Sequence, residues 1–339
     1  MLSAQTTVVT ALVDLQSRES SNRRDIDWYL TRCSGILSTR HSLVVFTEPQ
    51  LIEPLHEIRH RLAPDSSTRI VGLPFDQFPR TRDIPTITAA FDAGRRPPTA
   101  SNPVKDTPEY IALGWSKPGL LEVAANQDHF ASRMYWWADI ALLEVAQPLE
   151  GETFDRLLAS SDCGLHANVL WETAPPEYED RGRFYRETSF SKVAGGLFGV
   201  SANNVSRLSN DFDREIDQCL TSGWPTIDEV ILGVVVNQHF DNAELSYGPW
   251  ETLLSNFHEP RMAAWHRLRL LRDCLNRGLN ERAHKHCEQL NSAWVNGRIV
   301  LSVEEQQLLS DLRNQLRRRT RNDPVAETSV NSPDSIARQ

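Results

Sequence analysis

The chain has 339 residues, which is enough for one large domain or for one domain with an appendage. Its 40% of hydrophobic and 24% of charged residues exclude a collagen, a coiled-coil rod and a wholly disordered chain. The formal net charge is −9, and the one basic run lies at 317–321, so the chain lacks the broad basic face of a nucleic-acid-binding protein. We therefore expect no nucleic-acid partner.

Cysteine use and hydropathy predict a cytoplasmic protein. The five cysteines are scattered and odd in number, without a Cys-x-x-Cys pair, which is typical of a reducing compartment. The longest apolar run, at 230–236, is far shorter than the about 20 residues that span a bilayer. The first residues, MLSAQ, lack the basic region and apolar core of a signal peptide. We expect no transmembrane segment.

The first part of the chain alternates between strands and helices. Apolar, β-branched runs predict strands at 6–12, 42–47 and 69–73, and helical spacing of apolar residues predicts helices at 26–37 and 51–62. This βαβαβ order is typical of a parallel sheet with helices on its faces. Ligands of such sheets bind beyond the carboxyl ends of the strands, which places Asp14, Arg18 and Glu48 near a predicted pocket.

The middle of the chain continues this alternation with longer loops. Four prolines in 95–108 predict a loop, and Ser116 with Pro118 predicts the start of a helix that runs to about residue 133. A very apolar strand at 134–138 ends abruptly at Asp139. Further strands are predicted at 165–171, 192–200 and 245–250, helices at 201–221 and 226–236, and a polar, aromatic loop at 172–191.

The composition changes near residue 260 and divides the chain. We predict a main domain at 1–258, a helical appendage at 259–320 and a disordered tail at 321–339. In the appendage, a shared helical face joins Trp265 to Leu268, Leu271 and Leu275, and Ser302 with Glu305 forms a capping box before the last helix.

Asp139 is the residue that most strongly suggests chemistry. A carboxylate at the end of a buried strand is costly unless it is paired or binds a cation. Mg²⁺ bound to a diphosphate takes one or two protein carboxylates and leaves the other positions to phosphate oxygens and water. The alternative is an aspartate that caps the turn after the strand. Several familiar motifs are absent, namely G-x-G-x-x-G after the first strand, the Walker A loop, G-x-S-x-G and H-E-x-x-H.

Three blocks of sequence resemble a known family. They are TTVVTALVDLQSR at the start, TPEYIALGWSKPGLLEVA with YWWADIAL in the middle, and AGGLFGVSANNVSRL, TIDEVIL and YGPWETLLSNF further on. As an ordered set these resemble the bacterial HtrL/YibB family, also called WlaTC/HtrL, over residues 5–258. The resemblance implies an α/β, GT-A-like fold, that is, a Rossmann-like, mainly parallel sheet flanked by helices. It also implies a nucleotide-sugar-dependent glycosyltransferase, with residues 1–258 as its GT-A-like nucleotide-sugar-binding catalytic domain.

The resemblance gives Asp139 the place of the first aspartate in the Asp-x-Asp motif of GT-A enzymes. Ala141 replaces the second acid here. Either Asp139 and a distant ligand hold a divalent metal, Mn²⁺ or Mg²⁺, or Asp139 contacts the donor and the metal is dispensable. A late histidine is a third ligand in some GT-A enzymes, which makes His258 a candidate, with His239 as a competitor.

Asp228 and Glu229 are the candidate catalytic acids. An acidic pair at a helix start supplies the base in inverting GT-A enzymes, where the helix N-terminus favours an ionised carboxylate. We place Asp228 first and Glu229 second. The alternative for Glu229 is a capping box with Thr226.

The remaining candidates are contacts of the donor or the acceptor. Two glycines in a strand let a ligand approach the backbone, lysines can meet phosphates, and Tyr247 offers an aromatic platform. The alternatives are tight strand–helix packing, solvated lysines and core packing. The full set of predicted nucleotide or substrate contacts is Thr10, Asp14, Arg18, Lys105, Lys117, Asp139, Lys192, Gly195, Gly196 and Tyr247.

Together these features predict an enzyme that moves a sugar from a nucleotide-diphosphate donor to a hydroxyl or amine of a small-molecule or glycan acceptor. The helical appendage would dock on the catalytic domain or mediate a homodimer. The Asp-x-Ala departure motivates an alternative of another class, a catalytically degenerate scaffold that interacts through its appendage.

Overall fold

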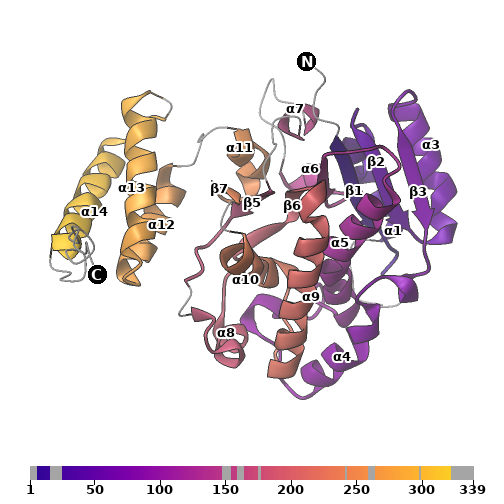
Figure 1. The fold of residues 1–339 in the computed structure, drawn as a ribbon, viewed down its shortest axis with the longest axis horizontal. Coiled ribbons are helices and arrows are strands. Elements are labelled where there is room, and N and C mark those ends of the chain that lie inside the picture. The colour runs from indigo at the N-terminus through magenta and orange to yellow at the C-terminus, as the bar shows by residue number, and fades with distance from the viewer. Residues whose placement is uncertain are drawn as a thin grey trace, which may run out of the picture. The chain divides into compact units, whose positions relative to one another are not determined.

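The chain folds as two compact units, Met1–Pro260 and Arg261–Gln339 (Figure 1). The computed structural model describes residues 6–15, 25–146, 154–158, 164–174, 177–240, 243–258, 264–297 and 299–321. The division falls two residues after the predicted end of the catalytic domain. Most of the predicted tail, and Arg18, lie outside the described residues. Within the described part, no helix has the length and apolar character needed to cross a membrane.

The first unit is built on a seven-stranded sheet with the order β3-β2-β1-β4-β6-β5-β7. Among the described strands, β6 alone runs antiparallel to its neighbours. The amino end of β6 therefore meets the carboxyl ends of the other strands at one edge, which we call the carboxyl edge. The strands are β1 (Thr6–Leu12), β2 (Ser42–Thr47), β3 (Thr68–Gly72), β4 (Met134–Ala138), β5 (Leu165–Val169), β6 (Val193–Ser201) and β7 (Glu244–Tyr247).

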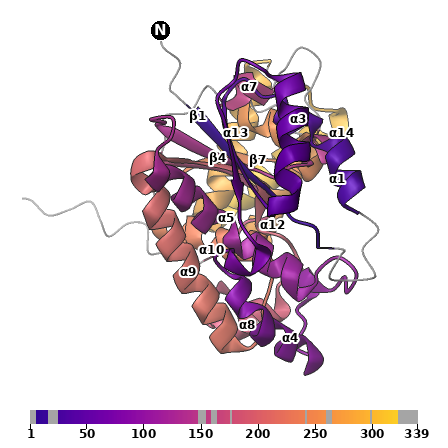
Figure 2. The ribbon, with the colours of Figure 1, turned by 90° about the vertical axis from the view of Figure 1, so that its right-hand side faces the viewer.

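Helices cover both faces of this sheet, as Figure 2 shows for α3 and α9 on opposite sides of the strands. On one face, a core that includes Val8, Ile36 and Leu253 joins β1 to the helices α2 and α11. On the other face, α5 packs on β1 and β4, and α9 and α10 pack on β6. The helices are α1 (Ile26–Arg32), α2 (Ser34–Leu37), α3 (Ile52–Leu62), α4 (Ile84–Asp92), α5 (Pro108–Gln127), α6 (Leu142–Val145), α7 (Phe154–Leu158), α8 (Arg181–Glu187), α9 (Val205–Ser222), α10 (Asp228–His239) and α11 (Leu253–His258).

The helix α5 begins earlier than predicted, and this corrects the place of Lys117. Thr107 is the N-cap and accepts a hydrogen bond from the Tyr110 amide, with Pro108 just inside the helix. The Ser116 hydroxyl donates to the Ala112 carbonyl instead of capping. The Thr-Pro pair supplies the complete start signal, so Lys117 lies in the middle of the helix and not at its dipole-disfavoured first turn.

Two other boundaries differ from the prediction. The segment 172–191, predicted as a loop, contains the helix α8, whose N-cap Asp180 accepts a hydrogen bond from the Arg183 amide. The last strand of the sheet ends at Tyr247, so Trp250 lies beyond it in a short 3₁₀ turn. Both differences place aromatic side chains at the carboxyl edge outside regular strands.

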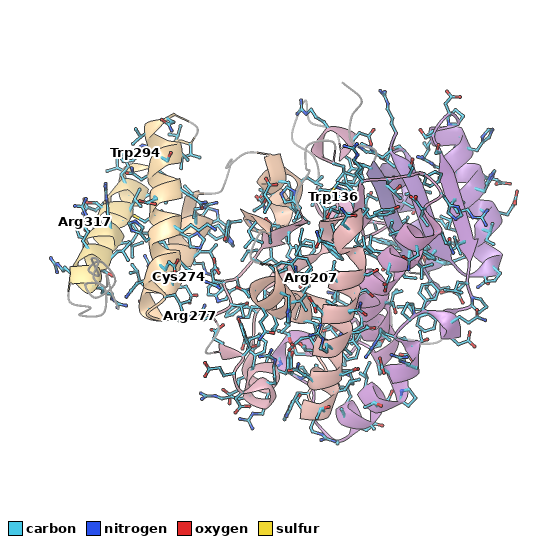
Figure 3. The ribbon with its side chains drawn as sticks, in the orientation of Figure 1. Trp136, Arg207, Cys274, Arg277, Trp294 and Arg317 are labelled. Carbon is cyan, nitrogen blue, oxygen red and sulfur yellow. The ribbon has the colours of Figure 1, made fainter. Side chains whose placement is uncertain are left out.

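The second unit consists of three helices around one apolar core. They are α12 (Ala264–Asn276), α13 (Asn280–Val295) and α14 (Val303–Arg321), and Figure 3 marks Cys274 and Arg317 among them. Leu268, Leu271 and Leu275 are buried as predicted, but Trp265 is 52% exposed. The predicted capping box is confirmed, because Ser302 and Glu305 exchange hydrogen bonds between side chain and backbone amide.

Candidate active site

Lys117 joins two carboxylates at the carboxyl edge of the sheet. Its Nζ atom lies 3.1 Å from Oδ1 of Asp139 and 2.8 Å from Oδ2 of Asp228, and it donates to the Gly195 carbonyl oxygen at 3.0 Å. These groups come from the middle of α5, the end of β4, the start of α10 and the start of β6. Only the assembled fold brings them together. We call Lys117, Asp139, Asp228 and Glu229 the lysine cluster.

Glycines in β6 make room for the lysine cluster. A Cβ atom on Gly195 would lie 2.5 Å from Oδ2 of Asp228. On Gly196 it would lie 2.9 Å from the Trp250 ring and 3.2 Å from Oδ2 of Asp139. Such distances leave no space for a side chain. The side chains of the site itself therefore favour glycine at both positions, which is a packing role. The predicted close approach of a ligand stays a prediction.

Asp139 is fixed by hydrogen bonds to β4 and β6, and its side chain remains accessible. Its amide donates to the Gly196 carbonyl at 2.9 Å, and its Oδ1 accepts from the Trp137 indole nitrogen at 2.7 Å. The N-cap of the following helix α6 is Ala141, which makes no side-chain cap bond. Asp139 therefore does not serve as the predicted alternative, a cap. Its side chain is 43% exposed, although it also pairs with Lys117.

Asp228 and Glu229 open α10, but the predicted capping box is wrong. The N-cap is Ile227, and no side chain caps it. The Thr226 hydroxyl is within 2.6 Å of the Thr99 hydroxyl, and the Thr226 carbonyl accepts from the Trp115 indole. Because Thr226 is engaged in these contacts, the Glu229 carboxylate is left to accept from the Gly195 amide at 3.4 Å.

The charges of the lysine cluster separate its acids by role. Burial lowers the pKa of Lys117, but Asp139 and Asp228 offset it, so the pKa lies above its ordinary value and the amine stays charged. Burial, and then the charge of Asp228, raise the pKa of Glu229 from 4.5 to about 7, against the opposing influence of Ser191, Lys117 and Lys105. The Glu229 carboxyl group therefore changes protonation near neutrality.

Tyr110 and Lys105 extend the cluster along α5 and the loop before it. Tyr110 is two helical turns before Lys117, and burial raises the pKa of its hydroxyl well above the ordinary value. The Nζ atom of Lys105 lies 5.4 Å from the centre of the Tyr110 ring, and Lys105 also acts electrostatically on Glu229. The predicted contact Lys105 is thus at the site, from an exposed position.

Lys192, Asp14, Thr10 and Tyr247 are at the carboxyl edge or inside the sheet but outside the lysine cluster. Lys192 is buried, with its Nζ 3.8 Å from Glu177. The Asp14 amide donates to the Glu48 carboxylate at 2.9 Å. Thr10 is fully buried, and among the described residues no hydrogen-bond partner is found for its hydroxyl. Tyr247 is buried at the end of β7.

The residues described by the structure contain no group of three metal-ligating side chains. His258 is the last residue of α11, and its side chain lies outside the described part of the chain, as does Arg18. The predicted second ligand therefore stays a prediction. His239, the competitor, faces Asp211, with its Nδ1 3.8 Å from that carboxylate, and is not part of the lysine cluster.

Sequence reasoning missed three side chains of the site, namely Tyr110, Trp137 and Ser191, whereas Trp250 belongs to the predicted aromatic platform with Tyr247. The signal for Tyr110 was present, because recognising Thr107-Pro108 as the helix start puts Tyr110 and Lys117 on one face. No local signal marks Trp137, which is one apolar residue in an apolar strand.

No protein-family model and no curated protein sequence matches the chain. Solved structures with a similar chain trace include core-mannan synthase A from Aspergillus fumigatus in its Mn/GDP form, with 8% identity, coverage of 71% of this chain and 72% of that chain, and a TM-score of 0.45. Mouse xyloside xylosyltransferase 1 in its apo form has 9% identity, coverage of 71% and 84%, and a TM-score of 0.35.

The predicted fold class is confirmed: a Rossmann-like, mainly parallel sheet flanked by helices, followed by a C-terminal helical region. Both similar structures are glycosyltransferases by their names. At such TM-scores the likeness identifies no activity, so the function proposed below rests on the contacts of the lysine cluster.

Proposed function

We propose that this protein is a glycosyltransferase that moves a sugar from a nucleotide-diphosphate donor to a hydroxyl or amine of a small-molecule or glycan acceptor. One observation carries the proposal. A carboxyl group with a pKa of about 7, Glu229, stands beside an ion-paired Asp228 and an accessible Asp139, at the edge where α/β sheets bind ligands.

The two acids at the start of α10 suit different tasks. Asp228 is paired with Lys117 at 2.8 Å, and this contact fixes the position of its carboxylate. Glu229 has a pKa close to the working pH, which is the property of an efficient general base. We therefore place Glu229 before Asp228 as the proton acceptor, which reverses the order that the sequence suggested.

The transfer itself is a displacement at the anomeric carbon of the donor sugar. The acceptor oxygen or nitrogen forms a bond to that carbon, and the bond from the carbon to the diphosphate breaks. The electron pair leaves with the diphosphate, and Glu229 takes the acceptor proton. Lys117, which is paired with Asp228, donates to the Gly195 carbonyl oxygen and so holds the strand whose Gly195 amide donates to Glu229.

The donor set suits a divalent metal that arrives with the donor. Asp139 offers one partly exposed carboxylate at the carboxyl edge. Mg²⁺ is commonly held by one or two carboxylates together with substrate phosphates. Asp139 would hold the ion, Mn²⁺ or Mg²⁺, which when bound would neutralise diphosphate charge. The homodimer through α12–α14 stays a prediction.

The test is a pair of measurements on Asp139→Asn. If Asp139 binds the donor or its metal, release of nucleoside diphosphate falls at least ~100-fold, equivalent to about 2.7 kcal/mol of transition-state stabilisation. The melting temperature without ligand changes little, since the side chain is partly exposed and Asp228 still pairs with Lys117. Thermal-shift titrations with UDP and GDP, with and without Mn²⁺, show whether binding is lost.

Asp273→Asn is the matched control. Asp273 also pairs with a cation, Arg277 at 2.5 Å, but it belongs to the helical unit. Its variant should keep full turnover. An Asp139→Asn protein that remains fully active would contradict the assignment. A wild-type protein that no nucleotide diphosphate stabilises would instead support the scaffold alternative.

A further inference from the structure

Two exposed apolar side chains belong to the segments that reach Glu229. Phe190 is 49% exposed and precedes Ser191, whose side chain hydrogen-bonds to Glu229. Val104 is 42% exposed and precedes Lys105, which acts electrostatically on the same carboxyl group. Two separate segments thus act on Glu229, one through the Ser191 hydrogen bond and one through the charge of Lys105. Each segment has an exposed apolar residue directly before that polar residue.

Phe190 does not stand alone, because Trp171 stacks on it. The two ring centres are 4.9 Å apart, and the planes differ by 23°. Trp171 follows β5 and its amide donates to the Lys192 carbonyl at 3.1 Å, so it is tied to the start of β6. Both rings therefore lie at the carboxyl edge. We call Trp171 and Phe190 the aromatic pair.

The aromatic pair combines stacking with exposure. Trp171 stacks against Phe190, and Phe190 is still 49% exposed, so part of the residue is available to a ligand. An aromatic face is electron-rich and apolar, and it attracts flat, weakly positive C–H surfaces. The axial C–H groups of a pyranose ring present such a surface, while the hydroxyls project from the ring rim.

We propose that the aromatic pair binds a pyranose ring of a carbohydrate acceptor and turns one of its hydroxyls toward Glu229. This inference rests on the proposed function and narrows the acceptor from any hydroxyl or amine to a glycan. Val104 adds apolar contact, and Ser191 and Lys105 supply polar contacts beside the base. An aliphatic or small amine acceptor would gain little from a stacking surface.

The experiment measures carbohydrate binding apart from transfer. Saturation-transfer NMR is recorded with maltose, cellobiose, lactose and α-1,6-mannobiose on the full chain, with UDP or GDP binding measured in parallel by calorimetry. For the bound disaccharide, Phe190→Ala should raise the Kd at least fivefold and Phe190→Trp should restore it. Nucleotide binding should stay unchanged in both variants, because neither touches Asp139.

Trp265→Ala is the matched control, since Trp265 is an aromatic of similar exposure, 52%, in the helical unit. It should leave disaccharide binding intact. Wild-type protein that shows no saturation transfer to any of the four disaccharides overturns the proposal. Equal affinity in Phe190→Ala and wild type also overturns it. Disaccharide binding that depends on Phe190 in a protein that binds no nucleotide supports the carbohydrate site while refuting the glycosyltransferase.

Discussion

Two clusters in the first unit each bury a cation against several aspartates, and they differ in what surrounds them. Arg80 has a side chain that is 1% exposed, and its guanidinium lies 2.6 Å from Asp83, 3.3 Å from Asp213 and 3.0 Å from Asp217. Lys117 is similarly buried between Asp139 and Asp228. Each cluster therefore combines one buried basic side chain with at least two aspartates.

The neighbouring groups distinguish a structural cluster from a reactive one. Each cluster pairs its cation with one confined aspartate, Asp83 or Asp228, each 13% exposed, and with aspartates that are more exposed. Asp228 differs because it lies against Gly195 of β6 and sits next to a glutamate whose pKa is about 7. A buried ion pair suggests a site when a neighbouring group titrates near neutrality.

Removing the two cations should separate the clusters most clearly. Lys117→Met keeps the apolar stem but leaves Asp228 buried without a counter-charge, so the free energy of unfolding should fall by about 3–5 kcal/mol. Arg80→Met should cost less, about 1–3 kcal/mol, because Asp213 and Asp217 regain water and only Asp83, 13% exposed, stays confined without its cation. Asp228, in contrast, also faces the Glu229 carboxyl group. Urea unfolding of both variants measures the difference. Equal losses would mean that Asp83 needs its cation as much as Asp228 does.

Glu229 should give the first unit a pH dependence of stability that extends to about pH 7. Its folded pKa of about 7 lies above the ordinary 4.5, so the native state holds the proton more tightly than the unfolded state. Stability contributed by this proton is fully present below pH 4.5 and is lost as the pH rises through about 7, by about 3 kcal/mol. Urea midpoints measured from pH 4.5 to pH 8 in wild type and Glu229→Gln test this.

Glu229→Gln should remove that loss, and Glu57→Gln, at an exposed glutamate of α3, should retain it. The same titration governs the proposed base. Turnover should therefore rise with a midpoint near pH 7 and fall strongly in the glutamine variant. A pH dependence of stability that Glu229→Gln leaves unchanged would assign it to another group.

The smallest expected effect comes from two glycines that lie near the two cations. Gly195→Ala puts a methyl group 2.5 Å from the Asp228 carboxylate and should cost about 1–3 kcal/mol while displacing Asp228 from Lys117. Gly119→Ala, in α5, meets Pro79 next to Arg80 at 3.0 Å, and alanine's helix preference of about 1 kcal/mol should offset that contact. Thermal melts compare them. A stable Gly195→Ala would show that Asp228 has room to move.

Patterns among neighbouring residues were enough to predict several strands and helices and one helix cap. The strands at the start of the chain and the three C-terminal helices follow from β-branched runs and helical spacing, and Ser302 with Glu305 follows from capping chemistry. Asp139 could be singled out because a carboxylate ends a buried strand. The resemblance to a family supplied Asp228 and Glu229, which periodicity alone would have assigned to a cap.

The central role of Lys117 could not be predicted, because it depends on contacts between distant segments. Its Nζ meets groups from β4, β6 and α10, and no local pattern records the antiparallel placement of β6 next to β4. The start of α5 was predicted too late in the chain, so Lys117 was expected in the first turn of the helix and not in its middle. The hydrogen bond between the Thr99 and Thr226 hydroxyls, which takes the place of a capping box with Glu229, also joins segments that are distant in the sequence.

The antiparallel insertion of β6 between β4 and β5 also has a consequence for how the chain reaches its native state. β4 and β5 complete their pairing only when β6, which follows both in the sequence, lies between them. Each such closure costs chain entropy before the new contacts compensate for it. The three sequential helices of the second unit close through neighbouring segments. We expect them to gain hydrogen-exchange protection early in refolding, while the amides around Gly195 are protected only in the final, rate-limiting step.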